Sequence, residues 1–257
     1  MTRVFNDPSN FALEAVSGMA TAYPQYVKAV HGGVVRATAS PDGQVAVIVG
    51  GGSGHFPAFA GWVGPGMAHG AVCGNIFASP SASQAYSVAK AADNGGGIII
   101  TYGNYAGDVL HFGQAAERLR AEGYDVRTIE VSDDVASGPR DDTRKRRGVA
   151  GDVVVFKIAG AAAERGHTID EVTELAWRAN DRTRSLGVAF DGCTLPGAAE
   201  PLFHVPAGQM SVGLGVHGEP GVYEVPMGTA SQIADLLVDG VNIGSVTNAG
   251  GTLSVPD

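Results

Sequence analysis

The sequence has few cysteines, little positive charge and no long apolar run, and each shortage excludes a class of protein. Cys73 and Cys193 are its two cysteines, and they form neither a disulfide framework nor a zinc-binding pattern. Lysine and arginine number 17 against 26 aspartate and glutamate, and the net charge of −9 argues against non-specific nucleic-acid binding. No apolar run reaches transmembrane length, and the N-terminus has no signal-peptide pattern. We therefore expect a protein of the reduced cytoplasm that binds no membrane and no nucleic acid directly.

Glycine, by contrast, is abundant, with 38 among 257 residues, and it separates apolar segments. In the first part of the chain, helical and strand patterns alternate, which favours a mostly parallel sheet covered by helices. The expected helices span about 10–22, 79–93, 108–122, 152–165 and 168–185, and the expected strands 45–49, 98–102 and 125–131.

A change of pattern near residue 186 predicts a second, smaller α/β lobe. Short strand-like pieces are separated there by glycine and proline, and one helix follows, over about 229–239. We thus expect an α/β fold of two lobes, residues 1–185 and 186–257. The tail, 242–257, has weak periodicity and is predicted to be irregular.

Three local signals refine these expectations. Ser79 followed by Pro80 is typical of a helix start, with the serine as N-cap. Thr168 followed three residues later by Glu171 is a capping box. Residues 132–148 are polar and charged, and predict a long exposed loop.

The most informative stretch is the glycine-rich segment 50–59, which follows the predicted strand 45–49 and contains His55. Glycines at this density let the backbone approach a ligand closely. The segment lacks the lysine of a phosphate-binding P-loop, and its spacing fits neither the dinucleotide fingerprint nor the esterase elbow. A tight structural turn and a ligand-binding loop both remain open from the segment alone.

Two other residues could act with His55. Asp108 stands at a predicted helix start, where the helix dipole favours an ionised carboxylate, although it could simply cap the helix. His217 ends an apolar segment and is held in a turn over residues 216–221, where it could equally be structural. Together, a neutral imidazole that attacks a carbonyl and a carboxylate that accepts a hydroxyl proton suit a small hydroxy-carbonyl substrate.

Other candidates are weaker. His69 and Cys73 lie four residues apart without further metal ligands, and we interpret them as structural. His111 could only pack on its own helix. Asp133 and Asp134 could bind a cation but fit a solvated turn better, and the basic run 144–147 fits a solvated loop or a docking surface.

Five separated motifs, in order, resemble the K subunit, or K domain, of dihydroxyacetone kinases, and the resemblance extends from near residue 5 to about 240. They are 50–57, 104–108, 146–150, 160–166 and 217–221. The resemblance implies that His217 binds the substrate carbonyl covalently as a hemiaminal. It implies that Asp108 is the base on the hydroxyl that receives phosphate, and that His55 assists. Gly52, Ser53 and Gly54 would line the substrate pocket.

The resemblance also implies partners. This chain would bind no cofactor, because ATP or ADP and magnesium sit on a separate L subunit or fused L domain in that family. The donor is either ATP or a phosphotransferase-system protein. The chain would be the substrate-binding half, inactive alone and homodimeric.

The sequence departs from the family pattern at a few positions. Phe56 replaces a glutamate, Phe59 a histidine and Gly103 a lysine. The two phenylalanines resemble a subset that includes erythrulose kinases, so dihydroxyacetone and a four-carbon ketose are both candidate substrates. The segment 242–257 does not resemble the family's continuation, which suggests a truncated or divergent K domain. The alternatives are a non-catalytic coactivator that binds the ketose and an inactive fragment; the presence of both Asp108 and His217 favours the enzyme.

Overall fold

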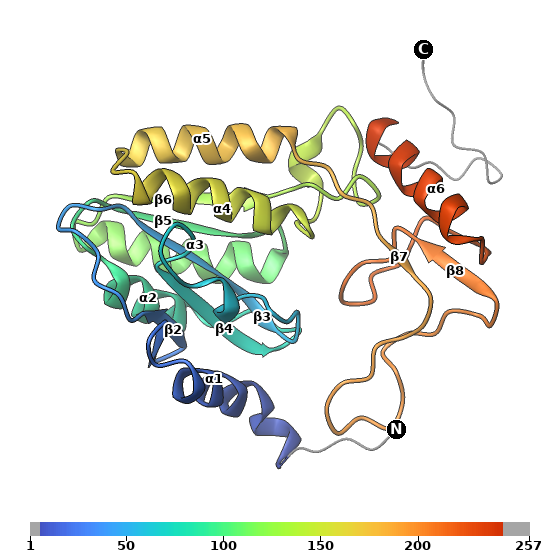
Figure 1. The fold of residues 1–257 in the computed structure, drawn as a ribbon, viewed down its shortest axis with the longest axis horizontal. Coiled ribbons are helices and arrows are strands. Elements are labelled where there is room, and N and C mark those ends of the chain that lie inside the picture. The colour runs from blue at the N-terminus through green and yellow to red at the C-terminus, as the bar shows by residue number, and fades with distance from the viewer. Residues whose placement is uncertain (1–5, 244–257) are drawn as a thin grey trace. The chain divides into compact units, whose positions relative to one another are not determined.

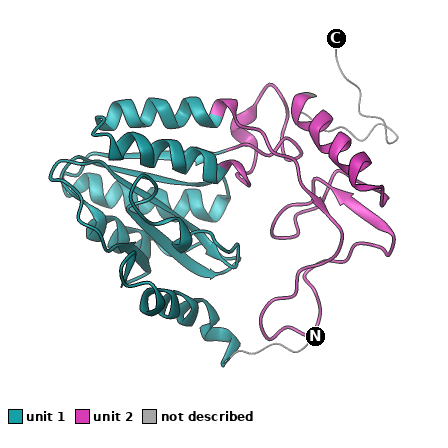
Figure 2. Ribbon diagram, viewed as in Figure 1, with its two compact units in different colours: residues 1–131, 152–180 teal, residues 132–151, 181–257 magenta. Residues whose placement is uncertain are grey.

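The computed structural model describes residues 6–243. The chain divides into two compact units, residues 1–131 with 152–180 (unit 1) and residues 132–151 with 181–257 (unit 2) (Figure 2). The chain therefore passes between the units three times, and residues 132–151 group with the C-terminal part. The boundary that we expected at 185/186 lies close to the last of these passages. The predicted irregular tail lies mostly outside the described residues.

Unit 1 contains a six-stranded sheet with the strand order β1-β2-β4-β3-β5-β6. The parallel part of the sheet consists of β3 (Ala46–Ser53), β4 (Gly70–Ile76), β5 (Ile98–Gly103) and β6 (Val126–Val131). Two short antiparallel strands, β1 (Val27–Val30) and β2 (Gly33–Arg36), extend one edge. Neither these two strands nor β4 was predicted. The expected α/β architecture with a mostly parallel sheet is confirmed.

Helices cover both faces of this sheet (Figure 1). On one face lie α2 (Ala82–Ala92) and α3 (Ala106–Ala121), and on the other lie α4 (Gly151–Glu164) and α5 (Ile169–Arg182). A further helix, α1 (Phe11–Ala22), follows a short 3-10 turn. The boundaries of all five helices lie within three residues of those expected from the sequence.

The alternation of side chains along β3 and β5 explains the two layers of helices. Val47 and Ile99 belong to the apolar cluster beneath α4 and α5, whereas Ile48, Ile98 and Ile100 belong to the cluster beneath α2 and α3. Because successive strand residues point to opposite faces, an unbroken apolar run is what a sheet buried on both faces requires.

Unit 2 has a smaller sheet and a different interior. Its antiparallel strands are β7 (Val188–Ala189), β8 (Gln209–Val212) and β9 (Tyr223–Pro226), and α6 (Ala230–Ile243) follows them. The strand-like pieces near β7 and β8 were expected, but β9 was not. The segment 132–148, expected to be an exposed loop, contains the buried residues Ser132, Asp133, Asp134, Val135 and Arg146.

Asp133 shows why the expectation of a solvated turn was wrong. Its fully buried carboxylate accepts hydrogen bonds from the backbone N–H groups of Val149, at 2.9 Å, and Gly151, at 2.8 Å, and from the Ser185 hydroxyl. Arg146 is likewise fully buried and donates from Nε to the Gly138 carbonyl at 3.2 Å. These partners are distant in sequence, so a polar composition alone does not distinguish this segment from a solvated loop.

Among the described residues, no helix is both long and apolar enough to cross a membrane.

Candidate functional site

The first part of the glycine-rich segment, residues 50–53, is the end of a central strand rather than part of a loop. β3 continues through Gly50, Gly51 and Gly52 to Ser53, and Ser53 pairs with Ile76 of β4. A Cβ atom added at Gly52 would lie 2.7 Å from the backbone nitrogen of Ala78, closer than real Cβ contacts allow. Glycine is therefore needed here because the chain after β4 crosses against the strand, and the turn begins only at Gly54, where φ is +106°.

His55 follows directly on this turn and stacks on Phe77, with ring centroids 4.6 Å apart and an angle of 21° between the rings. Just before it, the Ser53 hydroxyl donates to the Gly74 carbonyl at 2.7 Å. The end of β3 and the imidazole are thus both held by residues that follow or end β4.

Asp108 lies in the first turn of α3, where the helix dipole stabilises a carboxylate. It does not cap the helix, because the N-cap residue is Tyr105. Its side chain is buried, and Oδ1 accepts a hydrogen bond from the Ser79 hydroxyl at 2.9 Å. The fold thus keeps this carboxylate out of bulk water but gives it a donor.

Ser79 therefore has a different role from the one that its sequence context suggests. α2 is capped by Ser81, whose Oγ accepts from the Gln84 N–H while Gln84 Oε1 accepts from the Ser81 N–H. The Ser81–Gln84 pair satisfies two backbone groups reciprocally, which a cap at Ser79 could not do. Ser79 is thereby left outside the helix and available to Asp108.

His55 and Asp108 share one edge of the sheet because of the strand order. The chain leaves β3 toward β4 on one side, and leaves β5 toward β6 on the other. Adjacent strands whose connections diverge in this way form a topological switch point, the usual ligand crevice of open α/β sheets. His55 follows β3 and Asp108 follows β5, and the segment 77–79 contacts both.

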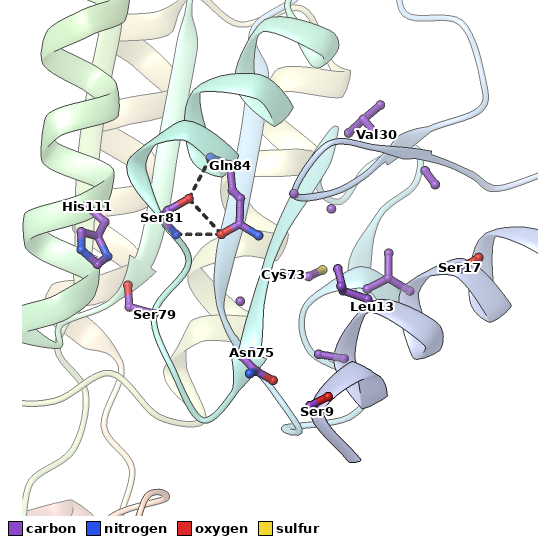
Figure 3. A pocket seen from close by; sticks show the side chains of 16 residues that line it. Ser9, Leu13, Ser17, Val30, Cys73, Asn75, Ser79, Ser81, Gln84 and His111 are labelled. Atoms are coloured by element: carbon purple, nitrogen blue, oxygen red, sulfur yellow. Dashed lines mark hydrogen bonds between the residues drawn. The ribbon is translucent and has the colours of Figure 1, made fainter. Parts of the chain in front are cut away.

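A cavity of about 510 Å³ adjoins this edge within unit 1. Ser79 and His111 line one side of it, and residues of α1 such as Leu13 line the opposite side (Figure 3). His55 and Asp108 do not line it. Ser79 thus borders the cavity while it donates to Asp108, but neither candidate residue lines the cavity.

His217 lies in unit 2, in a turn closed by hydrogen bonds from the Gly215 N–H to the Glu219 carbonyl and from the Gly218 N–H to the Gly215 carbonyl. The Glu219 carboxylate holds this histidine twice: Oε1 lies 3.0 Å from Nδ1 of the imidazole, and Oε2 accepts the His217 backbone N–H at 3.0 Å. About a quarter of the His217 side chain is exposed (26%).

Glu219 is held in its ionised form. Burial raises the pKa of its carboxyl group, but hydrogen bonds from its own backbone N–H and from His217 outweigh burial, so the pKa lies below its usual range. The carboxylate is thus an acceptor at neutral pH.

Gly52, Ser53, Gly54, His55 and Asp108 therefore lie together in unit 1, while His217 belongs to unit 2. Ser79 and Glu219 contact candidate residues and were missed by the sequence analysis. Glu219 could have been suspected from its place in the 217–221 motif, but Ser79 had a stronger local interpretation as a helix cap.

The weaker candidates have structural environments. Nδ1 of His69 accepts the Val47 N–H at 3.1 Å, and Nε2 lies 3.1 Å from Gln44 Oε1. Burial raises the pKa of the Cys73 thiol to about 12, which makes it unreactive. In the part of the chain that the structure describes, His, Cys, Asp and Glu side chains form no group of three or more that could hold a metal ion.

Comparison with known proteins decides the family. The profile of the Dak1 domain matches residues 17–252. The chain belongs to the Dak1 domain family. An L-erythrulose 1-kinase of Mycolicibacterium smegmatis is 64% identical over 241 residues, which are 94% of this chain and 42% of that protein.

Relatives of lower identity include a kinase subunit and two solved structures. The dihydroxyacetone-binding subunit DhaK of the Escherichia coli PEP-dependent dihydroxyacetone kinase is 39% identical over 93% of this chain and 67% of its own length. The crystal structure of the dihydroxyacetone kinase of C. freundii superposes with a TM-score of 0.85 at 38% identity, covering 95% of this chain and 46% of that one. The dihydroxyacetone kinase operon co-activator DhaQ superposes with a TM-score of 0.82 at 32% identity, covering 89% of this Dak1 chain and 70% of its own.

This Dak1 chain thus spans about two fifths of the length of the erythrulose kinase that it matches. The resemblance drawn from the five motifs is confirmed at the level of the family.

Proposed function

We propose that this chain is the substrate-binding component of a short-chain ketose kinase. The observation that carries the proposal is the buried Asp108 carboxylate at the topological switch point. It accepts a hydrogen bond from Ser79, and Phe77 of the same segment stacks on His55. A positioned carboxylate can take the proton from a hydroxyl as that oxygen attacks phosphorus. The kinases among its Dak1 relatives support this reaction class.

In this proposal His217 binds the ketose carbonyl covalently as a hemiaminal. A three- or four-carbon ketose offers few atoms for non-covalent binding, so a covalent bond supplies affinity that contacts alone could not. It also distinguishes a ketone from a polyol of the same length. His55 would hydrogen-bond the bound ketose, and Gly52, Ser53 and Gly54 would line its pocket.

We expect the substrate to be erythrulose or dihydroxyacetone, with erythrulose tested first. The relative with 64% identity is named for L-erythrulose, and the DhaK subunit with 39% identity for dihydroxyacetone. The choice between them lies with the residues around Phe56 and Phe59, where the sequence departs from the dihydroxyacetone kinase pattern.

The phosphate donor belongs on another component in this proposal. The sequence has no lysine or arginine between Arg36 and Lys90, so the glycine-rich segment itself supplies no side-chain cation for donor phosphates. We place ATP or ADP with magnesium on an L subunit or L domain, and we expect this chain to form a homodimer and to be inactive alone. The donor, either ATP or a phosphotransferase-system protein, then acts through that partner.

The test mixes the purified chain with an L partner, ATP and magnesium, and measures phosphate transfer to dihydroxyacetone and to each erythrulose enantiomer. Asp108→Asn should lower the rate by about 10²- to 10⁴-fold, the usual contribution of a general base. The matched control is Asp42→Asn, an exposed carboxylate of the same unit, which should leave the rate unchanged. Transfer to no ketose by the wild-type chain would refute the proposal.

A second candidate function is that of a non-catalytic, ketose-binding coactivator, favoured by the likeness to DhaQ. The same experiment separates the two. A coactivator would bind the ketose without transferring phosphate, and Asp108→Asn would then change no measured rate.

A further inference from the structure

The interactions of Glu219 point to a role for a residue that the proposed mechanism does not use. A histidine that attacks a carbonyl must present an unprotonated ring nitrogen, and either nitrogen of a neutral imidazole can be the protonated one. What decides between them is the hydrogen bond that the other nitrogen makes. At His217 that bond joins Nδ1 to Oε1 of Glu219 at 3.0 Å.

The carboxylate of Glu219 settles which nitrogen carries the proton. An ionised carboxylate only accepts hydrogen bonds, so Nδ1 must be the donor. Its other oxygen, Oε2, is occupied by the His217 backbone N–H at 3.0 Å, which prevents the carboxylate from rotating away. Nε2 is therefore the nitrogen left with a lone pair when the ring is neutral.

Glu219 is in turn anchored through Arg147. Nη1 of Arg147 lies 3.7 Å from Glu219 Oε2, while Nη2 lies 2.8 Å from Asp134 Oδ2. Arg147 also donates from Nε to Asp134 at 3.0 Å and from Nη2 to the Gly213 carbonyl at 3.1 Å. The Arg147 and Asp134 side chains are largely buried, at 14% and 7% exposure, so this pair is screened little by water.

Gly215 makes room for this arrangement. A Cβ atom added at that position would overlap both Glu219 Oε2 and Arg147 Nη1. Gly215 therefore faces the carboxylate and the guanidinium at the point where they approach each other. A side chain there would push them apart.

We propose that Glu219, fixed by Arg147 and Asp134, is a positioning residue that keeps the His217 proton on Nδ1 and so makes Nε2 the nucleophile toward a ketose. This proposal rests on the proposed function. In the step, Nε2 forms a bond to the carbonyl carbon, and the π electron pair of the C=O bond moves to oxygen, which takes up a proton. The ring keeps its Nδ1 proton and becomes cationic, solvent supplies the proton that the oxygen takes up, and the adjacent carboxylate stabilises the ring charge. The net change is addition of the Nε2 nitrogen and one proton across the C=O bond.

The first arm of the test reads the tautomer directly and needs no ketose. In the ¹⁵N-labelled chain, the His217 ring, assigned by comparison with His217→Gln, should show a protonated Nδ1 and an unprotonated Nε2. Glu219→Gln keeps the shape but lacks the charge, and should lose this preference. Glu224→Gln, an exposed carboxylate on β9 of the same unit, is the matched control and should retain it. A tautomer that is unchanged in Glu219→Gln would overturn the proposal.

The second arm measures capture of erythrulose and dihydroxyacetone as the fraction of covalent adduct against ketose concentration. Glu219→Gln should weaken capture by about 10- to 100-fold, the range seen when the carboxylate partner of a metal-binding histidine is removed. Arg147→Lys keeps the positive charge but lacks the planar guanidinium group that donates to both Asp134 and the Gly213 carbonyl. It should weaken capture of the ketose by less than Glu219→Gln does. If Glu219→Gln does not fold, Arg147→Lys carries the test, and capture equal to wild type in the variant tested would count against the proposal. Failure of the wild-type chain to capture any ketose would instead refute the proposed function. The role of Glu219 in fixing the His217 tautomer would then be decided by the ¹⁵N measurement alone.

Discussion

Unit 1 buries mainly apolar side chains, whereas the interior of unit 2 is built largely around charged and polar ones. Beneath the helices of unit 1 lie two apolar clusters that include Phe156 and Phe112, both fully buried. Among the described residues of unit 2, the buried apolar residues are Val135, Val205, Met210 and Val212, beside the buried polar residues Ser132, Asp133, Asp134, Arg146 and Ser211.

The difference explains how each unit supports its candidate residues. In unit 1 the positions of His55 and Asp108 follow from the strand order, and apolar packing makes that order stable. In unit 2 the environment of His217 follows from two hydrogen bonds to the Glu219 carboxylate. Because hydrogen bonds are directional and apolar contacts are not, the polar interior orients a side chain more narrowly, but it loses more when one partner is removed.

The largest effect should come from the apolar core of unit 1. Phe156→Ala removes a ring that lies 5.9 Å from Trp62 and 6.3 Å from Phe59, measured between ring centroids. We expect the free energy of unfolding to fall by about 3–5 kcal/mol. Chemical unfolding followed by tryptophan fluorescence measures this in unit 1, because both tryptophans, Trp62 and Trp177, belong to it.

The matched control is Phe190→Ala, an aromatic residue of unit 2 that is 47% exposed. Its effect on the same fluorescence transition should stay within about 0.5 kcal/mol. Equal losses in the two variants would contradict the contrast between the interiors.

A somewhat smaller effect should come from the polar interior of unit 2. Asp133→Asn replaces a carboxylate that accepts two backbone N–H groups and the Ser185 hydroxyl, so at least one donor faces a donor. We expect a loss of about 1.5–3 kcal/mol, the range for hydrogen bonds to a charged group. Hydrogen exchange of the unit 2 amides measures it. Asp141→Asn, an exposed carboxylate of the same unit, should leave exchange unchanged, and a loss as large as that of Asp133→Asn would contradict the prediction.

The smallest expected change in stability comes from a buried polar network inside the mainly apolar unit 1. His69 lies in a buried network in which Arg36 donates to Gln44 at 2.7 Å and to Glu164 at 2.8 Å. Burial, and secondarily the Arg36 charge, lower the pKa of His69 to about 4 from 6.5, while Glu164 acts in the opposite direction. Between these values the unfolded chain binds the proton and the folded chain does not, so stability is complete above pH 6.5 and is lost as the pH falls toward 4.

From this shift we expect the free energy of unfolding to be about 2 kcal/mol lower at pH 5 than at pH 7 on account of His69. The contribution of His69 is the difference between wild type and His69→Gln in the free energy of unfolding lost from pH 7 to pH 5. The other titrating groups are the same in both proteins, so their contributions cancel. A variant that loses as much stability as wild type on acidification would show that His69 is not responsible.

Much of unit 1 could be predicted from the sequence because its signals are local. The apolar runs before Gly50 and after Gly97 specify buried strands, and the Thr168–Glu171 pair forms the expected capping box at the start of α5. The prediction failed where two neighbouring residues could serve as the same helix cap. Ser79 was expected to cap α2, but the cap two residues later forms two reciprocal bonds.

The polar interior of unit 2 could not be predicted in the same way. Whether Asp133 or Arg146 is solvated depends on backbone groups far away in sequence, and a polar composition is equally compatible with both outcomes. The motifs pointed to His217. The role of Glu219 could be inferred only from the structure, in which the turn places its carboxylate within hydrogen-bonding distance of Nδ1 of His217. Residues that bear chemistry were thus easier to find than the residues that orient them.

The extension of β3 through Gly50–Ser53 has a consequence for motion. A loop with three glycines in a row would sample many conformations and would have to be ordered when a ligand arrives, at a cost in entropy. As part of a ladder with β4, this stretch has already lost that freedom during folding. Any closing movement around a bound ligand must therefore come from other segments, and the backbone amides of this stretch should exchange among the slowest in unit 1.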